Sequence, residues 1–166
     1  MQKFANSNAK DSVLSNCTFI NCSSKTRSGG AICWKDTGGK IVNNQFIGCY
    51  ALDGSNSAGG QAGAILFDGS AKNNQLINNT FTNCSSITGG AIYYRANNTN
   101  NTHINCTFTD NHAEQGGALY FVSSNNTYEN CNFTNNSAVN GGSIYYTVNN
   151  GIIISSYEKE DDTSKR

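Results

Sequence analysis

Two short motifs alternate along the chain at a nearly constant interval, and this repetition restricts the possible folds more than any other feature. The first motif is Gly-Gly-Ala-Ile or a close variant, followed by two more residues. It begins at Gly29, Ala62, Gly89, Gly116 and Gly141. The second motif centres on a phenylalanine, at Phe19, Phe46, Phe81, Phe108 and Phe133. Such a repeat predicts a solenoid in which each repeat forms one coil stacked on the previous coil.

The repeat has one irregular step. Successive phenylalanines are separated by 27, 35, 27 and 25 residues. The step of 35 contains the additional segment SNSAGGQA near residues 55–62. We interpret this segment as an enlarged loop that leaves the stacking of the coils unchanged.

Alternation of side chains within both motifs predicts β-strands. In NCTFT, Cys106 and Phe108 point one way while the threonines point the other. A third strand is expected between the two motifs, and four copies of it are recognisable. These are Lys40–Val42, Gln75–Ile77, Thr102–Ile104 and Thr127–Glu129. Because no helical spacing of apolar residues occurs, the sequence predicts an all-β parallel β-helix of about five coils of 25–35 residues.

Stacked coils place equivalent residues in columns about 4.8 Å apart. The expected inward columns contain large apolar side chains. They are the five motif phenylalanines; Ile32, Ile65, Ile92, Leu119 and Ile144; and Trp34, Phe67, Tyr94, Phe121 and Tyr146. These columns would form the whole core, which explains how a chain with only 37% apolar residues can fold.

The third residue after each motif phenylalanine is cysteine or asparagine. The five residues are Cys22, Cys49, Cys84, Asn111 and Asn136. An inward asparagine at a turn can bond the backbone of its own coil and the asparagine of the next. We expect cysteine to replace it as a small buried residue.

The seven cysteines favour free thiols over metal ligands or disulfides. Cys17, Cys106 and Cys131 lie two residues before a motif phenylalanine, and Cys33 is expected to point outward. Stacked neighbours have Cα separations compatible with a disulfide, but parallel Cβ vectors disfavour its torsion. Cys17 and Cys22 lack a second close pair, so no metal site and no cofactor are expected.

We expect three parts in the chain. Residues 1–11 form a partial N-terminal cap, because Phe4 is only 15 residues before Phe19. Residues 12–156 form the β-helix. Residues 157–166 carry seven of the 22 charged residues and are expected to be disordered or to act as a solubilising cap.

Charge and hydropathy exclude several function classes. The formal net charge is zero and only 13% of residues are charged, which gives no electrostatic reason to bind nucleic acid or an anionic membrane. The chain contains no stretch of 18 apolar residues, so the sequence predicts no membrane-spanning segment. The first ten residues, MQKFANSNAK, lack the apolar segment of a signal peptide, so an exported protein would need a leader outside this chain.

The two motifs resemble known surface-protein repeats. GGA[IL] paired with F-x-x-N resembles the repeats of chlamydial polymorphic outer membrane proteins, and NCTFTNNSAVNGGSIYY from Asn130 is similar to adhesin-like proteins of methanogenic archaea. The resemblance covers roughly residues 12–154. It implies a right-handed parallel β-helix exposed at the cell surface, with a role in adhesion. The chain departs from the pattern by having Cys in three of the five F-x-x-N sites and by lacking an anchor.

An outward aromatic column is the main candidate for ligand binding. Tyr93, Tyr120 and Tyr145 should line one exposed face on three successive coils, where tyrosines could contact sugar rings or a partner surface. The alternative is that tyrosine simply favours strands.

Glycosylation is a second candidate, because N-x-[ST] recurs throughout the chain. The acceptor sites expected in loops are Asn97, Asn100 and Asn125. An Asn/Thr-rich composition also produces this pattern by itself.

Acid–base catalysis requires clustered titratable groups. The carboxylates are scattered over different coils, and the one possible group combines Asp110 and His112 with His103. The scattered residues are Asp36, Asp53, Asp68, Asp110 and Glu114. We therefore predict no catalytic residues.

Regular threonine columns are a further feature, and they are typical of ice-binding solenoids. The threonines concerned are Thr18, Thr80, Thr82, Thr107, Thr109 and Thr134. Gln45, Ile47 and Asn132 interrupt these columns, so a solvated strand face is the default interpretation.

Three functions remain open. The first is a non-enzymatic extracellular or cell-surface adhesin-like protein that displays a face to glycans, host cells or neighbouring cells. The second is a polysaccharide lyase or hydrolase, since many parallel β-helices are such enzymes. The third is a structural spacer within a longer surface protein that contains further repeats.

Overall fold

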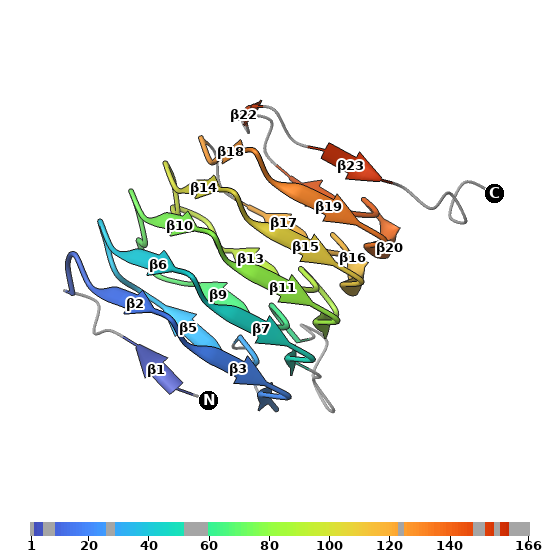
Figure 1. Cartoon of the computed structure of the whole chain (residues 1–166), viewed down its shortest axis with the longest axis horizontal. Coiled ribbons are helices and arrows are strands. Elements are labelled where there is room, and N and C mark those ends of the chain that lie inside the picture. Colours follow the sequence, from blue (N-terminus) through green and yellow to red (C-terminus); the bar gives the residue numbers. More distant parts are fainter. Residues whose placement is uncertain are drawn as a thin grey trace.

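The computed structural model describes residues 2–4, 9–25, 29–51, 60–122, 125–147, 152–154 and 157–159. These residues form four parallel sheets that run side by side along a rod (Figure 1). Sheet 1 contains β1 (Gln2–Phe4), β5 (Ile32–Trp34), β9 (Ile65–Phe67), β13 (Ile92–Tyr94), β17 (Leu119–Phe121) and β21 (Ile144–Tyr146). Sheet 2 contains β2 (Val13–Ser15), β6 (Lys40–Val42), β10 (Gln75–Ile77), β14 (Thr102–Ile104), β18 (Thr127–Glu129) and β22 (Ile152–Ile154).

The other two sheets complete each coil. Sheet 3 contains β3 (Thr18–Ile20), β7 (Gln45–Ile47), β11 (Thr80–Thr82), β15 (Thr107–Thr109), β19 (Asn132–Thr134) and β23 (Tyr157–Lys159). Sheet 4 contains β4 (Ser23–Ser24), β8 (Tyr50–Ala51), β12 (Ser85–Ser86), β16 (His112–Gln115) and β20 (Ser137–Asn140). The chain passes through sheets 2, 3, 4 and 1 in turn. Within the described residues it does so five times, which confirms a parallel β-helix of about five coils.

The register confirms the predicted columns. Phe81 pairs with Phe46 on one side and with Phe108 on the other, and Ile92 pairs with Ile65 and Leu119 in the same way. The four predicted copies of the third strand are β6, β10, β14 and β18 with the expected bounds. Sheet 4 was not predicted, because strands as short as Ser23–Ser24 are too brief to show alternation.

The core consists of stacked side chains. The rings of Phe19, Phe46, Phe81, Phe108 and Phe133 form one continuous stack, with centroids 4.8–4.9 Å apart and planes within 5° of parallel. The second aromatic column, which runs from Trp34 to Phe121, is buried, whereas its last member, Tyr146, is 50% exposed. Each coil thus buries its rings against the same rings of its neighbours.

The asparagine-rich turns have a common construction. An exposed residue with positive φ, usually asparagine, is followed by an inward asparagine or cysteine, as in Asn78-Asn79 (φ 54° at Asn78) and Asn83-Cys84 (φ 53° at Asn83). Asparagine tolerates the left-handed conformation better than most residues. The next side chain then faces the core, where it must find hydrogen-bond partners.

The inward asparagines form ladders of amide hydrogen bonds. Asn111 was predicted to form one, and its Nδ2 donates to Oδ1 of Asn136 at 2.9 Å and to the carbonyl of Phe81 at 3.0 Å. Two more ladders were not predicted. They consist of Asn44 and Asn79, and of Asn74, Asn101 and Asn126. All of these bonds link successive coils, so the ladders tie the rod together lengthwise.

At Gly30, Gly63, Gly90 and Gly117, the second glycine of the motif is required by the close approach of successive coils. A Cβ on Gly90 would collide with the carbonyl oxygen of Gly117, and a Cβ on Gly63 with that of Gly90. The first glycine of the motif has positive φ at Gly89, Gly116 and Gly141, and Ala62 takes the same conformation in its coil.

The ends of the rod extend the sheets. β1, within the predicted cap over residues 1–11, pairs with β5, and β22 pairs with β18. The predicted tail over residues 157–166 begins as β23, which pairs with β19, so its first three residues are part of sheet 3. Residues 5–8, 55–59 of the predicted enlarged loop, and 160–166 lie outside the described residues.

Candidate binding face

The predicted tyrosine column lies on the outside of sheet 1. The rings of Tyr93 and Tyr120 stack with centroids 4.9 Å apart, and those of Tyr120 and Tyr145 with centroids 5.3 Å apart. Their exposure differs from the prediction. Tyr93 is only 9% exposed, and Tyr120 and Tyr145 are half-buried. Because the rings stack face to face, the column presents ring edges and hydroxyls rather than ring faces.

Tyr93 is buried because it belongs to a second apolar cluster outside the main core. Its buried members are Cys33, Ala62, Leu66 and Tyr93, with Tyr120 and Val122 packed against them. Cys33 was expected to point outward, and it does lie outside the main core, but it is only 6% exposed. Burial raises the pKa values of Tyr93 and Tyr120, and the neighbouring tyrosine adds to the effect in each case. Both hydroxyls are therefore protonated and can donate hydrogen bonds at neutral pH.

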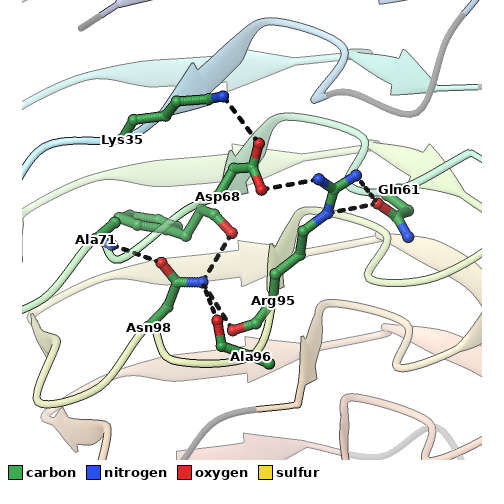
Figure 2. Close-up of polar contacts among 8 residues, drawn as sticks. Lys35, Gln61, Asp68, Ala71, Arg95, Ala96 and Asn98 are labelled. Atoms are coloured by element: carbon green, nitrogen blue, oxygen red, sulfur yellow. Dashed lines mark hydrogen bonds and ion pairs between the residues drawn. The ribbon is translucent and has the colours of Figure 1, made fainter. Parts of the chain in front are cut away.

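A ladder of opposite charges follows the strands of sheet 1 in successive coils (Figure 2). Lys35, Asp68 and Arg95 each follow the last residue of a sheet 1 strand in successive coils. Nζ of Lys35 lies 3.1 Å from Oδ2 of Asp68, and Nη1 of Arg95 lies 2.8 Å from Oδ1 of Asp68. Burial alone would raise the pKa of Asp68, but the bonds from the Gly69 backbone, Arg95 and Lys35 outweigh it and lower this pKa.

Two amide side chains hold Arg95 and the turn that follows it. Oε1 of Gln61 accepts from Nε of Arg95 at 3.0 Å and from Nη2 at 2.6 Å, as Figure 2 shows. Oδ1 of the buried Asn98 accepts from the backbone N–H of Ala71 at 2.8 Å, and its Nδ2 donates to the carbonyl of Arg95 at 2.7 Å. The guanidinium is thus held in place, close enough to Tyr93 for its charge to act on the hydroxyl of that tyrosine.

The sequence reasoning missed Lys35, Arg95 and Gln61. Lys35 lies two residues after Cys33, Asp68 two after Leu66 and Arg95 two after Tyr93. Residues two apart on a strand share a face. The succession of positive, negative and positive charge at one column position could therefore have predicted this charge ladder from the sequence.

The acid–base candidates do not converge. Asp36 is completely buried and accepts the backbone N–H groups of Ser12 at 2.6 Å and Thr37 at 2.7 Å. Asp110, His112 and Glu114 are exposed, whereas His103 lies in the core. Asp53 is outside the described residues. Among the residues that the structure describes, no three His, Cys, Asp or Glu side chains form a group that could hold a metal ion.

The predicted glycosylation sites lie on turns. Asn97, Asn100 and Asn125 are exposed, and each has positive φ. The residue after each of them, Asn98, Asn101 or Asn126, is buried. The acceptor amides are therefore displayed at the surface of the rod.

The threonines are aligned on sheet 3. Thr80 pairs with Thr107, and Thr82 pairs with Thr109, which pairs with Thr134. Thr80 also pairs with Gln45, and Thr107 with Asn132, so the columns are interrupted where the sequence indicated.

The fold and this face define a class of protein: a parallel β-helix whose outer surface carries a stacked aromatic column beside a fixed charge ladder. A family model described as "Right handed beta helix region" matches residues 4–158. The chain therefore belongs to the right-handed β-helix family.

No curated protein and no solved structure matches it. No helix among the described residues is long and apolar enough to cross a membrane. In general terms, the fold supports a surface or carbohydrate-related protein.

Proposed function

We propose that this chain is a non-enzymatic, adhesin-like β-helix that acts at the cell surface and binds glycans or a partner surface through the outer face of sheet 1. The observation that carries the proposal is the stack of Tyr93, Tyr120 and Tyr145. Tyrosine edges supply apolar contact at a small entropic cost, and their hydroxyls bond to polar partners.

The charge ladder supports binding rather than catalysis. The carboxylate of Asp68 is shared between Lys35 and Arg95, and Gln61 occupies two further donors of Arg95. A carboxylate held in this way with a lowered pKa is a poor general base. A prepositioned guanidinium beside aromatic rings, in contrast, suits recognition of hydroxyl or carboxylate groups on a sugar.

A glycan array tests this proposal. We expect the purified chain to bind a limited set of glycans, and the variant Tyr120→Ala/Tyr145→Ala to lose at least tenfold in affinity. Tyr50→Ala is the matched control, because Tyr50 is 39% exposed but lies on β8 of sheet 4. Equal binding by both variants and the wild-type chain would place the ligand elsewhere. Absence of binding by the wild-type chain would favour a spacer.

The enzymatic alternative has its own readout. The same glycans are incubated with the protein, and newly formed reducing ends or unsaturated sugars are measured. The proposal requires that none accumulate. If the protein cleaves a glycan and a substitution of Asp68 or Asp110 abolishes this cleavage, the protein is a lyase or hydrolase rather than an adhesin.

A further inference from the structure

Five of the seven cysteines stack on one another in two columns. Thiol column 1 contains Cys22, Cys49 and Cys84, and thiol column 2 contains Cys106 and Cys131. The backbone register fixes both columns. Cys22 and Cys49 immediately precede the paired residues Ser23 and Tyr50, and Cys106 and Cys131 immediately precede the paired Thr107 and Asn132.

The thiols within a column have the same orientation. Sγ of Cys49 lies 3.8 Å from the carbonyl oxygen of Ile47 and 3.5 Å from that of Phe19. Sγ of Cys84 makes the equivalent contacts, 3.6 Å from the carbonyl oxygens of both Thr82 and Phe46. In column 2, Cys106 and Cys131 repeat this pattern with contacts of 3.4–3.7 Å. Equal contacts in successive coils mean that each sulfur is related to the next by the step between coils.

The distances between the stacked phenylalanine rings give the separation of successive coils. The ring centroids of Phe19 and Phe46 are 4.9 Å apart, and those of Phe46 and Phe81 are 4.8 Å apart, with planes 3° from parallel in both pairs. For Phe108 and Phe133 the values are 4.8 Å and 5°. The coils are thus related almost by pure translation, and the sulfurs follow at about the same spacing.

This spacing is wrong for a disulfide and right for a linear metal bridge. A disulfide brings two sulfurs to about 2.05 Å and requires a torsion near 90°. The Zn–S bond is about 2.3 Å long, and two metal–sulfur bonds of similar length in line span roughly 4.6 Å. Soft thiolates select Cu(I) and similar soft cations. A two-coordinate cation needs only the two sulfurs that each step provides.

We propose that the two thiol columns bind soft monovalent cations, Cu(I) or Ag(I), each held in line between the sulfurs of successive coils. On binding, two thiols release two protons and two metal–sulfur bonds form, so the bis-thiolate complex carries one negative charge. No oxidation or reduction takes place. This inference is independent of the glycan-binding proposal.

The exposure of column 1 supports loading. Cys22 is only half-buried and lies beside β4, the terminal strand of sheet 4, which gives a cation an entry point to column 1.

Ag(I) is the first probe, because it has no accessible redox chemistry in the assay. Native mass spectrometry of the full chain titrated with Ag(I) should show at least two tightly bound ions, one for each column. The variants are Cys49→Asn, which leaves Cys22 and Cys84 two coils apart, and Cys131→Asn. Each should lose the ions of its own column, and the double variant should lose both sets.

Asparagine is the appropriate replacement because the fold already accepts it at both positions. Asn111 and Asn136 follow Cys84 in one column, and Asn44 and Asn79 share the position of Cys131 in the other. Unchanged circular dichroism of the metal-free variants verifies folding. The control is Cys17→Ser/Cys33→Ser, because the in-register neighbours of these cysteines are Asn44 and Leu66 rather than cysteines.

The outcomes are decisive in both directions. Loss of Ag(I) in the asparagine variants, with retention in the serine control, supports the columns. If the double asparagine variant binds Ag(I) as the wild type does, or if the serine control loses Ag(I), the proposal that the thiol columns bind the metal is wrong. X-ray absorption on the Cu(I)-loaded chain should show two sulfur neighbours per metal, whereas three or more ligands would overturn the linear geometry.

Discussion

The hydroxyl of Tyr94 lies 2.8 Å from Nε2 of His103 at the centre of the rod, where both side chains are completely buried. The imidazole also stacks on Tyr128, with ring centroids 4.4 Å apart. Burial lowers the pKa of His103 to about 3, because an imidazolium there would lose its hydration. The core of this protein therefore contains a histidine that must remain neutral.

We predict that this histidine makes the fold sensitive to acid. The unfolded chain binds a proton at His103 below pH 6.5, whereas the folded chain does not until about pH 3. Its contribution to stability is therefore complete above pH 6.5 and falls by about 1.4 kcal/mol per pH unit towards pH 3. Urea unfolding at intervals from pH 7 to pH 4 measures this slope.

The variant Tyr94→Phe/His103→Leu provides the control for the acid prediction. Phe67 and Phe121 flank Tyr94 in its column, and Leu76 precedes His103, so both replacements match their neighbours. We expect stability at pH 7 within about 1 kcal/mol of the wild type, since both partners of the hydrogen bond are removed together. The slope attributed to His103 should disappear. An unchanged slope would assign the acid sensitivity to other groups.

Phe81→Ala tests the stacking of the coils. The ring is completely buried between Phe46 and Phe108, each with its centroid 4.8 Å away. We expect a loss of about 3–5 kcal/mol in the free energy of unfolding, measured with urea. Thr80→Ala, on the outer side of the same strand, should change it by less than about 1 kcal/mol. Similar effects of the two changes would contradict the register.

Gly90→Ala tests the approach of successive coils. The added Cβ would meet the carbonyl oxygen of Gly117 and the backbone of His112, neither of which can move away alone. We expect a cost of about 3 kcal/mol or more. At Gly69 the added Cβ meets nothing within 4 Å, but φ is +70°, so Gly69→Ala should cost only about 1–2 kcal/mol. The comparison separates steric collision from backbone conformation, and thermal unfolding of the two variants decides it.

Asn79→Ala tests the amide ladder. Oδ1 of Asn79 accepts from the backbone N–H of Asn44 at 3.0 Å, and its Nδ2 donates to the carbonyl of Ile41 at 2.7 Å. Alanine leaves the buried backbone N–H of Asn44 without its acceptor and removes one hydrogen bond to the carbonyl of Ile41, and an unpaired buried group costs about 1–3 kcal/mol. Asn79→Cys should be milder, because Cys106 fills the same position in the next coil and contacts the carbonyl of Leu76 at 3.4 Å. Equal losses for the two variants would show that the amide contributes packing alone.

The columns were predictable because the pattern repeats at a spacing that only stacking explains. Phe81 and Phe108 have the same neighbours in sequence and hence the same neighbours in space. The amide ladder at Asn44 and Asn79 was missed, although the cysteines at the same column position had been recognised as inward. What was lacking was the conformation of the preceding residue, whose positive φ turns the next side chain towards the core.

The binding face was only partly predictable. Alternation places Tyr93, Tyr120 and Tyr145 on the outside of their strands, but it does not show what packs over an outward side chain. Tyr93 is buried because Leu66 and Cys33 precede it in the column and form an apolar cluster with Ala62. His103 was considered together with Asp110 and His112, although the predicted third strands already placed it at the same position as Leu76 and Tyr128.

The glycine column constrains how such a chain can diverge. At Gly63, Gly90 and Gly117 the space for a side chain is occupied by the backbone of the following coil, so no single replacement elsewhere compensates for a substitution. A segment of one full repeat, in contrast, carries its own glycine, phenylalanine and turn asparagines, and it contacts only the coil before and the coil after it. In-frame duplication or deletion of one repeat therefore keeps every contact type intact, and descendants of this gene should differ in length more readily than at these positions.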